Sequence, residues 1–197
     1  MMRTQILRST LCMSLFCLIT VTGYADEGNF FMRLDQDIFD AIYDEPPQSE
    51  PLGTTMEIGT YFGDGRLMLG VSLLLMAYGN DERRETGRLL TSTFISTGVI
   101  VWGMKEIIGR KRPLDEEVGN PAFPSGHTAY AFAGATLLGN RYPKLRIPLY
   151  IGAGLVGFTR IYLGRHYASD VIAGAAVGTI TGALVSRHCG TLLEWRF

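Results

Sequence analysis

One stretch of the sequence decides the fold: VIAGAAVGTITGALVS, at residues 171–186. It carries no charged side chain, and its residues do not alternate between apolar and polar as in a half-buried strand. Gly174, Gly178 and Gly182 recur at every fourth position and therefore share one face of a helix. Because small residues let helix backbones approach closely, the stretch predicts a helix packed tightly against another helix.

Four further apolar segments have the length and residue choice of helices. They cover Leu67 to Tyr78, Leu89 to Ile108, Thr128 to Leu138, and Ile147 to Leu163. Gly79-Asn80 and the charged residues 81–88 predict a turn, and Gly109 with Pro113 predicts the end of the second segment. Together with residues 171–186, these segments predict an all-α protein, a compact helical bundle of about five core helices.

The sequence leaves open whether this bundle lies in a membrane. Its uncharged runs are about 12 to 16 residues long, whereas roughly 18 or more identify a membrane-spanning helix. The glycine seam is typical of membrane bundles but also occurs in tightly packed soluble ones. With only 19% charged residues in the chain, we favour a membrane protein and keep a soluble bundle as the alternative.

The amino terminus has the layout of an export signal. Arg3 and Arg8 precede an apolar run at residues 11–21, and Ala25 follows that run. We expect a signal peptide cleaved after Ala25, with an uncleaved N-terminal anchor helix as the alternative. Either leader sends the chain to the bacterial cell envelope, as an inner-membrane protein with a periplasm-facing site or as a soluble periplasmic protein.

We therefore divide the chain into three parts: a leader or anchor at residues 1–25, an acidic lead-in at 26–54, and a helical domain at 55–190. Residues 26–50 hold eight acidic side chains against the single Arg33. We expect this lead-in to lie on the surface, with one short amphipathic helix and no chemistry.

Charge and cysteine content exclude two classes of protein. A net charge of -1 offers no basic stripe for nucleic acid. Of Cys12, Cys17 and Cys189, only the last would remain after removal of the leader, so no intrachain disulfide is expected.

The first polar island between the apolar segments is KEIIGRKRP, residues 105–113. Lys105 and Arg112 lie seven residues apart, about two helical turns, and could therefore project from one helix face toward an anion. A solvated basic loop, or a flank of positive charge at a membrane edge, is the alternative interpretation.

The second island is FPSGHT, residues 123–128. Ser125 is a favoured helix cap, and the helix start behind it offers backbone N–H groups to an anion. Gly126 would let a phosphate oxygen approach the main chain, and His127 could hold or deliver a proton. A capping turn with an incidental histidine is the alternative.

The third island is TRIYLGRHYASD, residues 159–170. One helical turn separates His166 from Asp170, so the carboxylate could fix the tautomer of the imidazole and leave its other nitrogen free to attack phosphorus. Arg160 adds a third cation. A purely structural His–Asp hydrogen bond is the alternative.

Taken together, the islands hold cations, backbone donors, an oriented nucleophile and an acid/base, which is a complete set for phosphoryl transfer. We find no pair of carboxylates near them that would hold a divalent ion among phosphates, and we expect no metal ion and no other cofactor.

At these residues the sequence resembles the type 2 phosphatidic acid phosphatase and haloperoxidase superfamily, over roughly residues 55–187. Lys105, Arg112 and Pro113 match its first signature block, and Pro124 to His127 match the second. Arg160, His166 and Asp170 match the third block, with Thr159 where the family has serine. Threonine keeps the hydroxyl group, although its extra methyl group could change how Arg160 is held.

The resemblance implies a phosphatase that works through a phosphohistidine without metal. It implies that His166 attacks phosphorus, that Asp170 orients His166, and that His127 protonates the leaving oxygen and then activates water. The phosphoryl oxygens would be held by Lys105, Arg112, Ser125, Gly126 and Arg160.

The expected substrate is a phosphate monoester or pyrophosphate of a membrane lipid, such as phosphatidate, phosphatidylglycerol phosphate, an isoprenyl pyrophosphate or a lipid A phosphate. The first alternative is a soluble periplasmic non-specific acid phosphatase of the same superfamily. A vanadate-dependent haloperoxidase and a non-catalytic membrane scaffold are further alternatives. His188 lies outside every block and is expected on the surface.

Overall fold

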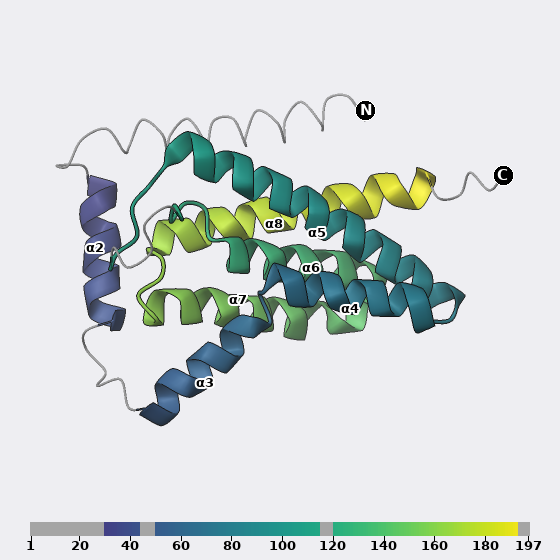
Figure 1. Cartoon of the computed structure of the whole chain (residues 1–197), viewed down its shortest axis with the longest axis horizontal. Helices are drawn as coiled ribbons and strands as arrows, with labels where there is room; N and C mark the ends of the chain where they lie inside the picture. The colour runs from purple at the N-terminus through teal and green to yellow at the C-terminus, as the bar shows by residue number, and fades with distance from the viewer. Residues whose placement is uncertain (1–29, 44–49, 115–119, 193–197) are drawn as a thin grey trace.

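The computed structural model describes residues 30–43, 50–114 and 120–192. All regular elements in these ranges are helical, which confirms the predicted all-α class. They are α2 (Phe30–Tyr43), α3 (Glu50–Tyr61), α4 (Gly65–Tyr78), α5 (Asp81–Ile108), α6 (Gly126–Arg141), the 3-10 helix η1 (Pro143–Leu145), α7 (Arg146–Tyr162) and α8 (Ala168–Leu192). The five predicted segments correspond to α4 through α8 (Figure 1).

The charged patch predicted as a turn instead forms the start of α5. The helix begins at Asp81, and the side chain of Asn80 caps it by accepting from the backbone N–H of Arg83 at 3.0 Å. Asp81 and Glu82 lie in the first turn, where carboxylates oppose the positive end of the helix dipole. Charge at this point therefore stabilises a helix start instead of interrupting the chain, and only Gly79-Asn80 forms the turn.

Helix α6 lies at the centre of the bundle and packs against α5, α7 and α8 (Figure 1). The glycine seam of α8 faces it. A Cβ atom at Gly178 would collide with the carbonyl oxygen of Ala129, and one at Gly182 would lie 2.6 Å from the carbonyl oxygen of Ala133. The predicted close approach of two helix backbones is thus the contact between α6 and α8.

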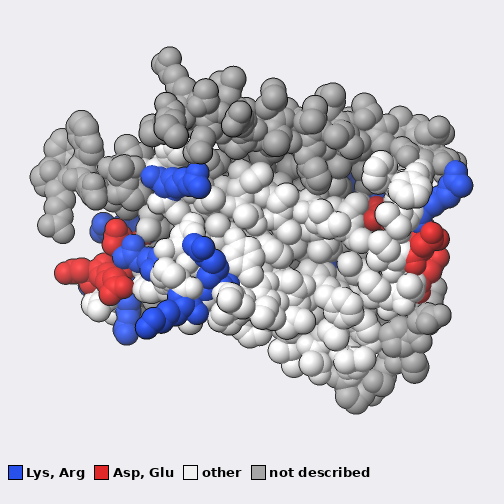
Figure 2. Space-filling model, turned by 180° about the vertical axis from the view of Figure 1, so that it is seen from behind, with Lys and Arg blue, Asp and Glu red and all other residues white. Residues whose placement is uncertain are grey.

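The outer helices expose many large apolar side chains. They include Val71 and Leu74 of α4, Val99 and Trp102 of α5, and Ile151 and Leu155 of α7. Figure 2 shows a broad uncharged zone on one face of the molecule, with charged side chains gathered toward its two ends. Residues Ala168–His188 of α8 form a helix long and apolar enough to cross a membrane, although much of that helix is buried in the bundle.

The lead-in contains the predicted amphipathic helix, α2. Its buried residue Phe39 packs against Ile161 of α7 and Ala168 of α8, so α2 covers the end of the bundle where α7 passes into α8. Helix α3 packs against α7 and runs through residue 54, where the sequence predicted the lead-in to end. The predicted leader at residues 1–25, with Cys12 and Cys17, lies outside the described residues.

Candidate active site

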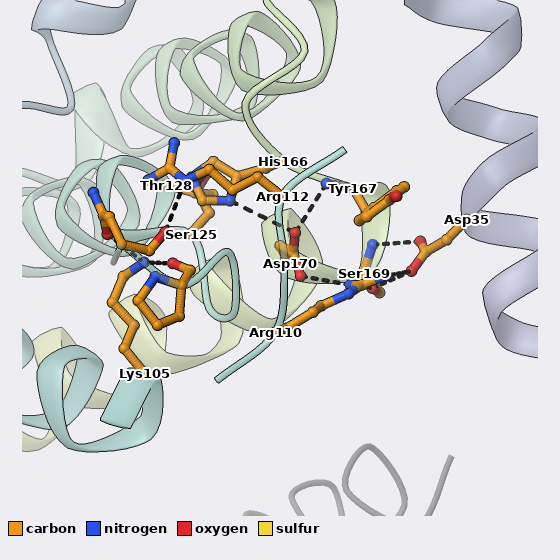
Figure 3. A network of polar contacts seen from close by, with 12 residues as sticks. Asp35, Lys105, Arg110, Arg112, Ser125, Thr128, His166, Tyr167, Ser169 and Asp170 are labelled. Carbon is orange, nitrogen blue, oxygen red and sulfur yellow. Dashed lines mark hydrogen bonds and ion pairs between the residues drawn. The ribbon is translucent and has the colours of Figure 1, made fainter. Parts of the chain in front are cut away.

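The three polar islands meet at one end of the bundle, where α5 ends, α6 begins and α7 turns into α8 (Figure 3). The backbone N–H of Ser125 donates to the carbonyl oxygen of Asp170 at 3.0 Å, which ties the second island to the third. The first island is tied to the approach to the second, because the ammonium group of Lys105 contacts the carbonyl oxygen of Pro121.

Lys105 and Arg112 do not share a helix face, and the sequence interpretation was wrong on this point. Helix α5 ends at Ile108 because Gly109 adopts a left-handed conformation with φ 59° and its N–H closes the helix on Lys105. The two cations meet at Asn120 instead. Lys105 Nζ donates to Asn120 Oδ1 at 3.3 Å, and Arg112 Nε donates to the Asn120 carbonyl oxygen at 3.0 Å.

Ser125 occupies the N-cap position of α6, but its side chain does not cap the helix. Its Oγ accepts from Thr128 Oγ1 at 2.9 Å instead. The serine hydroxyl proton is therefore available for another acceptor. The first N–H groups of α6, at Gly126 and His127, have no acceptor within the helix and form the kind of helix start that binds anions.

His166 precedes α8, and Asp170 lies in the first turn of that helix. His166 Nδ1 lies 3.6 Å from Asp170 Oδ2, slightly beyond hydrogen-bonding distance, with both side chains buried. Asp170 Oδ2 also accepts from the backbone N–H of Tyr167 at 2.9 Å. Since Nδ1 faces the carboxylate, Nε2 is the nitrogen left for attack on phosphorus.

Arg160 is buried near the end of α7, and its guanidinium group donates to Thr60 Oγ1 of α3 at 2.8 Å. Its carbonyl oxygen accepts from the N–H of His166 at 3.2 Å, so Arg160 is bonded both to α3 and to the backbone of His166. The hydroxyl of Thr159 donates to the Val156 carbonyl oxygen at 2.7 Å. The Thr159 methyl group faces Gly59, where an added Cβ would lie 3.3 Å away, so glycine provides space for the unusual threonine.

Burial determines the charge of both site histidines. Desolvation, reinforced by the nearby Arg160 and Arg112, lowers the pKa of His166 to about 4 although Asp170 acts in the opposite direction. Desolvation and Arg160 likewise lower the pKa of His127 to about 4, against the opposing charge of Asp64. Both imidazoles are therefore neutral at pH 7 in the protein without substrate, and the lone pair of His166 is available.

Sequence reasoning missed several side chains that support this site. Thr60, Arg110 and Asp35 contact Arg160, Asp170 and Ser169, respectively. Arg110 lies inside the first island, so its charge could have identified it as a candidate site residue. Thr60 and Asp35 lie on helices far away in the chain and carry no local signal. His188 is exposed on α8, as predicted.

Comparison with known proteins places these residues in a family context. The family model described as the PAP2 superfamily matches residues 85–192. The chain is 40% identical over 124 residues to the lipid A 1-phosphatase of Porphyromonas gingivalis, an alignment that covers 59% of this chain and 27% of that protein. It is 28% identical over 188 residues to the lipid A 1-phosphatase of Rhizobium etli, covering 78% of this chain and 81% of that protein.

A solved structure shares the fold. The crystal structure of Aquifex aeolicus LpxE superimposes with a TM-score of 0.68 at 26% sequence identity, covering 79% of this chain and 96% of that chain. The family match includes all three polar islands, because residues 85–192 contain Lys105, His127 and His166.

Proposed function

The chain belongs to the PAP2 superfamily, and on that premise we propose that it is a phosphatase of a membrane lipid that forms a phosphohistidine on His166. The observation that carries this proposal is the placement of the nucleophile. His166 is buried against Asp170, and the backbone of Asp170 is bonded to Ser125 at the start of α6. The nucleophile and the anion-binding helix start are thereby held next to each other.

In the first step, His166 Nε2 attacks phosphorus, and the bond from phosphorus to the leaving oxygen breaks. His127 gives that oxygen a proton. In the second step, water attacks the phosphohistidine, His127 takes a proton from the water, and the bond between Nε2 and phosphorus breaks to release inorganic phosphate. Both steps conserve atoms and charge without any metal ion.

The phosphoryl oxygens are held by three side-chain cations and by donors at the start of α6. Lys105 and Arg112 approach from the end of α5, and Arg160 from α7. Gly126 contributes backbone N–H, and Ser125 contributes its hydroxyl proton. Such preorganised donors stabilise the negative charge that builds up on the oxygens during transfer.

His127 must carry a proton in the substrate complex although its pKa is about 4 in the free protein. A bound phosphate dianion reverses part of that shift, because a negative charge nearby favours the imidazolium form. Substrate binding therefore prepares the general acid, whereas in the free protein the lowered pKa keeps His127 neutral beside Arg160.

The substrate we propose is a phosphorylated lipid of the cell envelope, of the kind cleaved by lipid A 1-phosphatases. Two observations support it: the relatives carry that name, and α4, α5 and α7 expose apolar side chains suited to a bilayer. An inner-membrane location with the site facing the periplasm is part of this proposal. The soluble acid phosphatase is the second candidate, since only α8 meets the length and composition of a span among the described residues.

The test compares the full-length protein with its His166→Ala variant in detergent-solubilised membranes, with EDTA present. Phosphate release is measured from lipid A, phosphatidate, undecaprenyl diphosphate and p-nitrophenyl phosphate. We expect release from a lipid that survives EDTA and is lost in His166→Ala. Preference for p-nitrophenyl phosphate would favour the soluble acid phosphatase, and equal background from both proteins on all substrates would overturn the phosphatase proposal.

A further inference from the structure

Helix α2 brings a buried carboxylate to the back of the active site. Asp35 Oδ1 accepts from the backbone N–H of Ser169 at 2.9 Å, and Oδ2 contacts the hydroxyl group of the same serine (Figure 3). Asp35 is 6% exposed. The helix is anchored there by Phe39, whose ring lies edge-on to the ring of Tyr167 at 5.7 Å. Asp35 is therefore held against the start of α8, next to the turn that carries His166.

Arg110 joins this carboxylate to the one beside the nucleophile. Its Nη2 donates to Asp35 Oδ2 at 2.8 Å, and its Nη1 donates to Asp170 Oδ1 at 2.6 Å. The guanidinium group lies over the Tyr167 ring, 4.3 Å from the ring centroid, and the side chain is 5% exposed. A planar guanidinium can hold two carboxylates in fixed directions, which a lysine ammonium cannot do.

These contacts fix how Asp170 faces His166. One carboxylate oxygen of Asp170 is bound by Arg110, and the other accepts from the Tyr167 N–H and faces His166 Nδ1. With both oxygens engaged and the side chain fully buried, the carboxylate cannot rotate away from the imidazole. If Asp170 rotated away, the proton of the imidazole would no longer be held on Nδ1, and Nε2 could carry it instead.

Charge gives Asp35 a second role. Asp170 and Arg110 alone would form a neutral pair, which would respond weakly to a positive charge on the neighbouring imidazole. The second carboxylate gives the buried group of three a net charge of about −1. That charge is complementary to the positive ring that forms when His166 bonds to phosphorus.

We propose that Arg110 and Asp35 are positioning residues for the phosphatase reaction, which set the orientation and charge of Asp170 and thereby the reactivity of His166. This inference rests on the proposed function. Neither residue belongs to the set that would contact the phosphate, so their loss is expected to slow the phosphorylation of His166 while leaving substrate binding nearly unchanged.

The test uses the near-isosteric variant Asp35→Asn in the full-length protein, with Asp37→Asn on the exposed side of the same helix as the matched control. Steady-state kinetics are measured on the best lipid substrate, and thermal unfolding in the same detergent gives the folded fraction. We expect Asp35→Asn to lower kcat per folded molecule on the order of tenfold with KM within about twofold of wild type. Asp37→Asn is expected to match wild type in both.

A double-mutant cycle distinguishes positioning from general support of the fold. If Asp35 acts through Asp170, Asp35→Asn should change kcat less than about twofold in an Asp170→Asn background. Additive effects of the two changes would overturn the inference, as would a wild-type kcat in Asp35→Asn. Should Asp35→Asn not fold, Arg110→Lys serves the same purpose, because it keeps the charge and loses the fork; wild-type kcat there would overturn the inference equally.

The controls separate this inference from the proposed function. Activity in wild type that is lost in His166→Ala, together with unchanged kcat in Asp35→Asn and Arg110→Lys, would reject the positioning role alone. A wild type without lipid phosphatase activity would reject the function itself.

Discussion

Gly174 of α8 lies directly against the carbonyl oxygen of Ser125, with no room for a side chain between them. Ser125 also donates its N–H to Asp170, four residues before that glycine. The start of α6 and the start of α8 are thus held together by a hydrogen bond and a steric contact at the same point. The glycine seam, which indicated the fold, also sets the distance between the start of α6 and the start of α8, where the proposed phosphate site and the proposed nucleophile lie.

The first prediction concerns Gly174→Ala. The new methyl group would push the Ser125 backbone away, and we expect a loss of about 1–3 kcal/mol in the free energy of unfolding together with a fall in kcat. Gly70→Ala in α4 is the matched control, because a Cβ there meets nothing within 4 Å and alanine favours a helix. Denaturant unfolding and phosphate release would test both. Equal stability of the two variants would contradict the contact.

The second prediction concerns Thr60, whose hydroxyl oxygen accepts a hydrogen bond from the guanidinium group of Arg160. Thr60→Val removes the acceptor and leaves a buried guanidinium with one bond fewer. Because hydrogen bonds to charged groups contribute about 1.5–3 kcal/mol, we expect kcat/KM to fall roughly tenfold or more. Thr60→Ser keeps the hydroxyl and is expected to retain most activity. A loss in Thr60→Ser with wild-type kcat/KM in Thr60→Val would indicate that the threonine methyl group, and not the hydroxyl, matters.

The third prediction concerns Thr159, where the family pattern has serine. Since the methyl group packs toward Gly59 and not toward the phosphate site, Thr159→Ser should leave kcat and KM within about twofold and cost only about 0.5–1.5 kcal/mol of stability. Thr159→Ala also removes the bond to the Val156 carbonyl oxygen and is expected to cost more. A large change in KM for Thr159→Ser would show that the methyl group does position Arg160.

The fourth prediction concerns the ionisation of the two site histidines. In a His188→Gln variant, only His127 and His166 remain, and their ring NMR signals should keep the neutral form as pH falls from 7 to about 5 because both pKa values lie at about 4. Adding vanadate as a phosphate analogue should raise the pKa of His127. A ring that titrates at the ordinary value of about 6.5 without ligand would show that the site is solvated.

The same shifts predict how stability depends on pH. The folded pKa of each histidine lies below its unfolded value, so the unfolded chain binds more protons between about pH 6.5 and pH 4. Stability from these groups is complete above that window and is lost as pH falls through it. Thermal unfolding of His166→Ala should therefore show a weaker decline over this window than wild type does. A parallel decline in both proteins would contradict burial of His166.

Local patterns in the sequence predicted most of the helices and the three islands that the fold brings together, because helix periodicity and the islands are local features. The prediction failed where a short signal had two interpretations. Charge at residues 81–88 signalled a turn, but with Asn80 before it the same charge forms a capped helix start. Lys105 and Arg112 have helical spacing, but Gly109 ends the helix between them.

Long-range contacts could not be predicted at all. Thr60 and Arg160 are separated by 100 positions, and Asp35 and Ser169 by 134. Nothing in the sequence distinguishes Asp35 from the seven other acidic residues of the lead-in. Its burial results from the packing of Phe39 on the ends of α7 and α8. The expectation that this lead-in has no chemistry therefore differs from the positioning role that we propose for Asp35.

The span between Asp35 and Ser169 also has a consequence for biosynthesis. Helix α2 leaves the ribosome well before α8, so early in translation Asp35 has no Ser169 to bind, and Arg110 has no Asp170. Under the proposed roles, Asp170 takes up its fixed orientation beside His166 only when α8 has docked against α2 and Arg110. A partly synthesised chain would then lack the oriented pair, and full reactivity of His166 would follow only when α2 and α8 have docked.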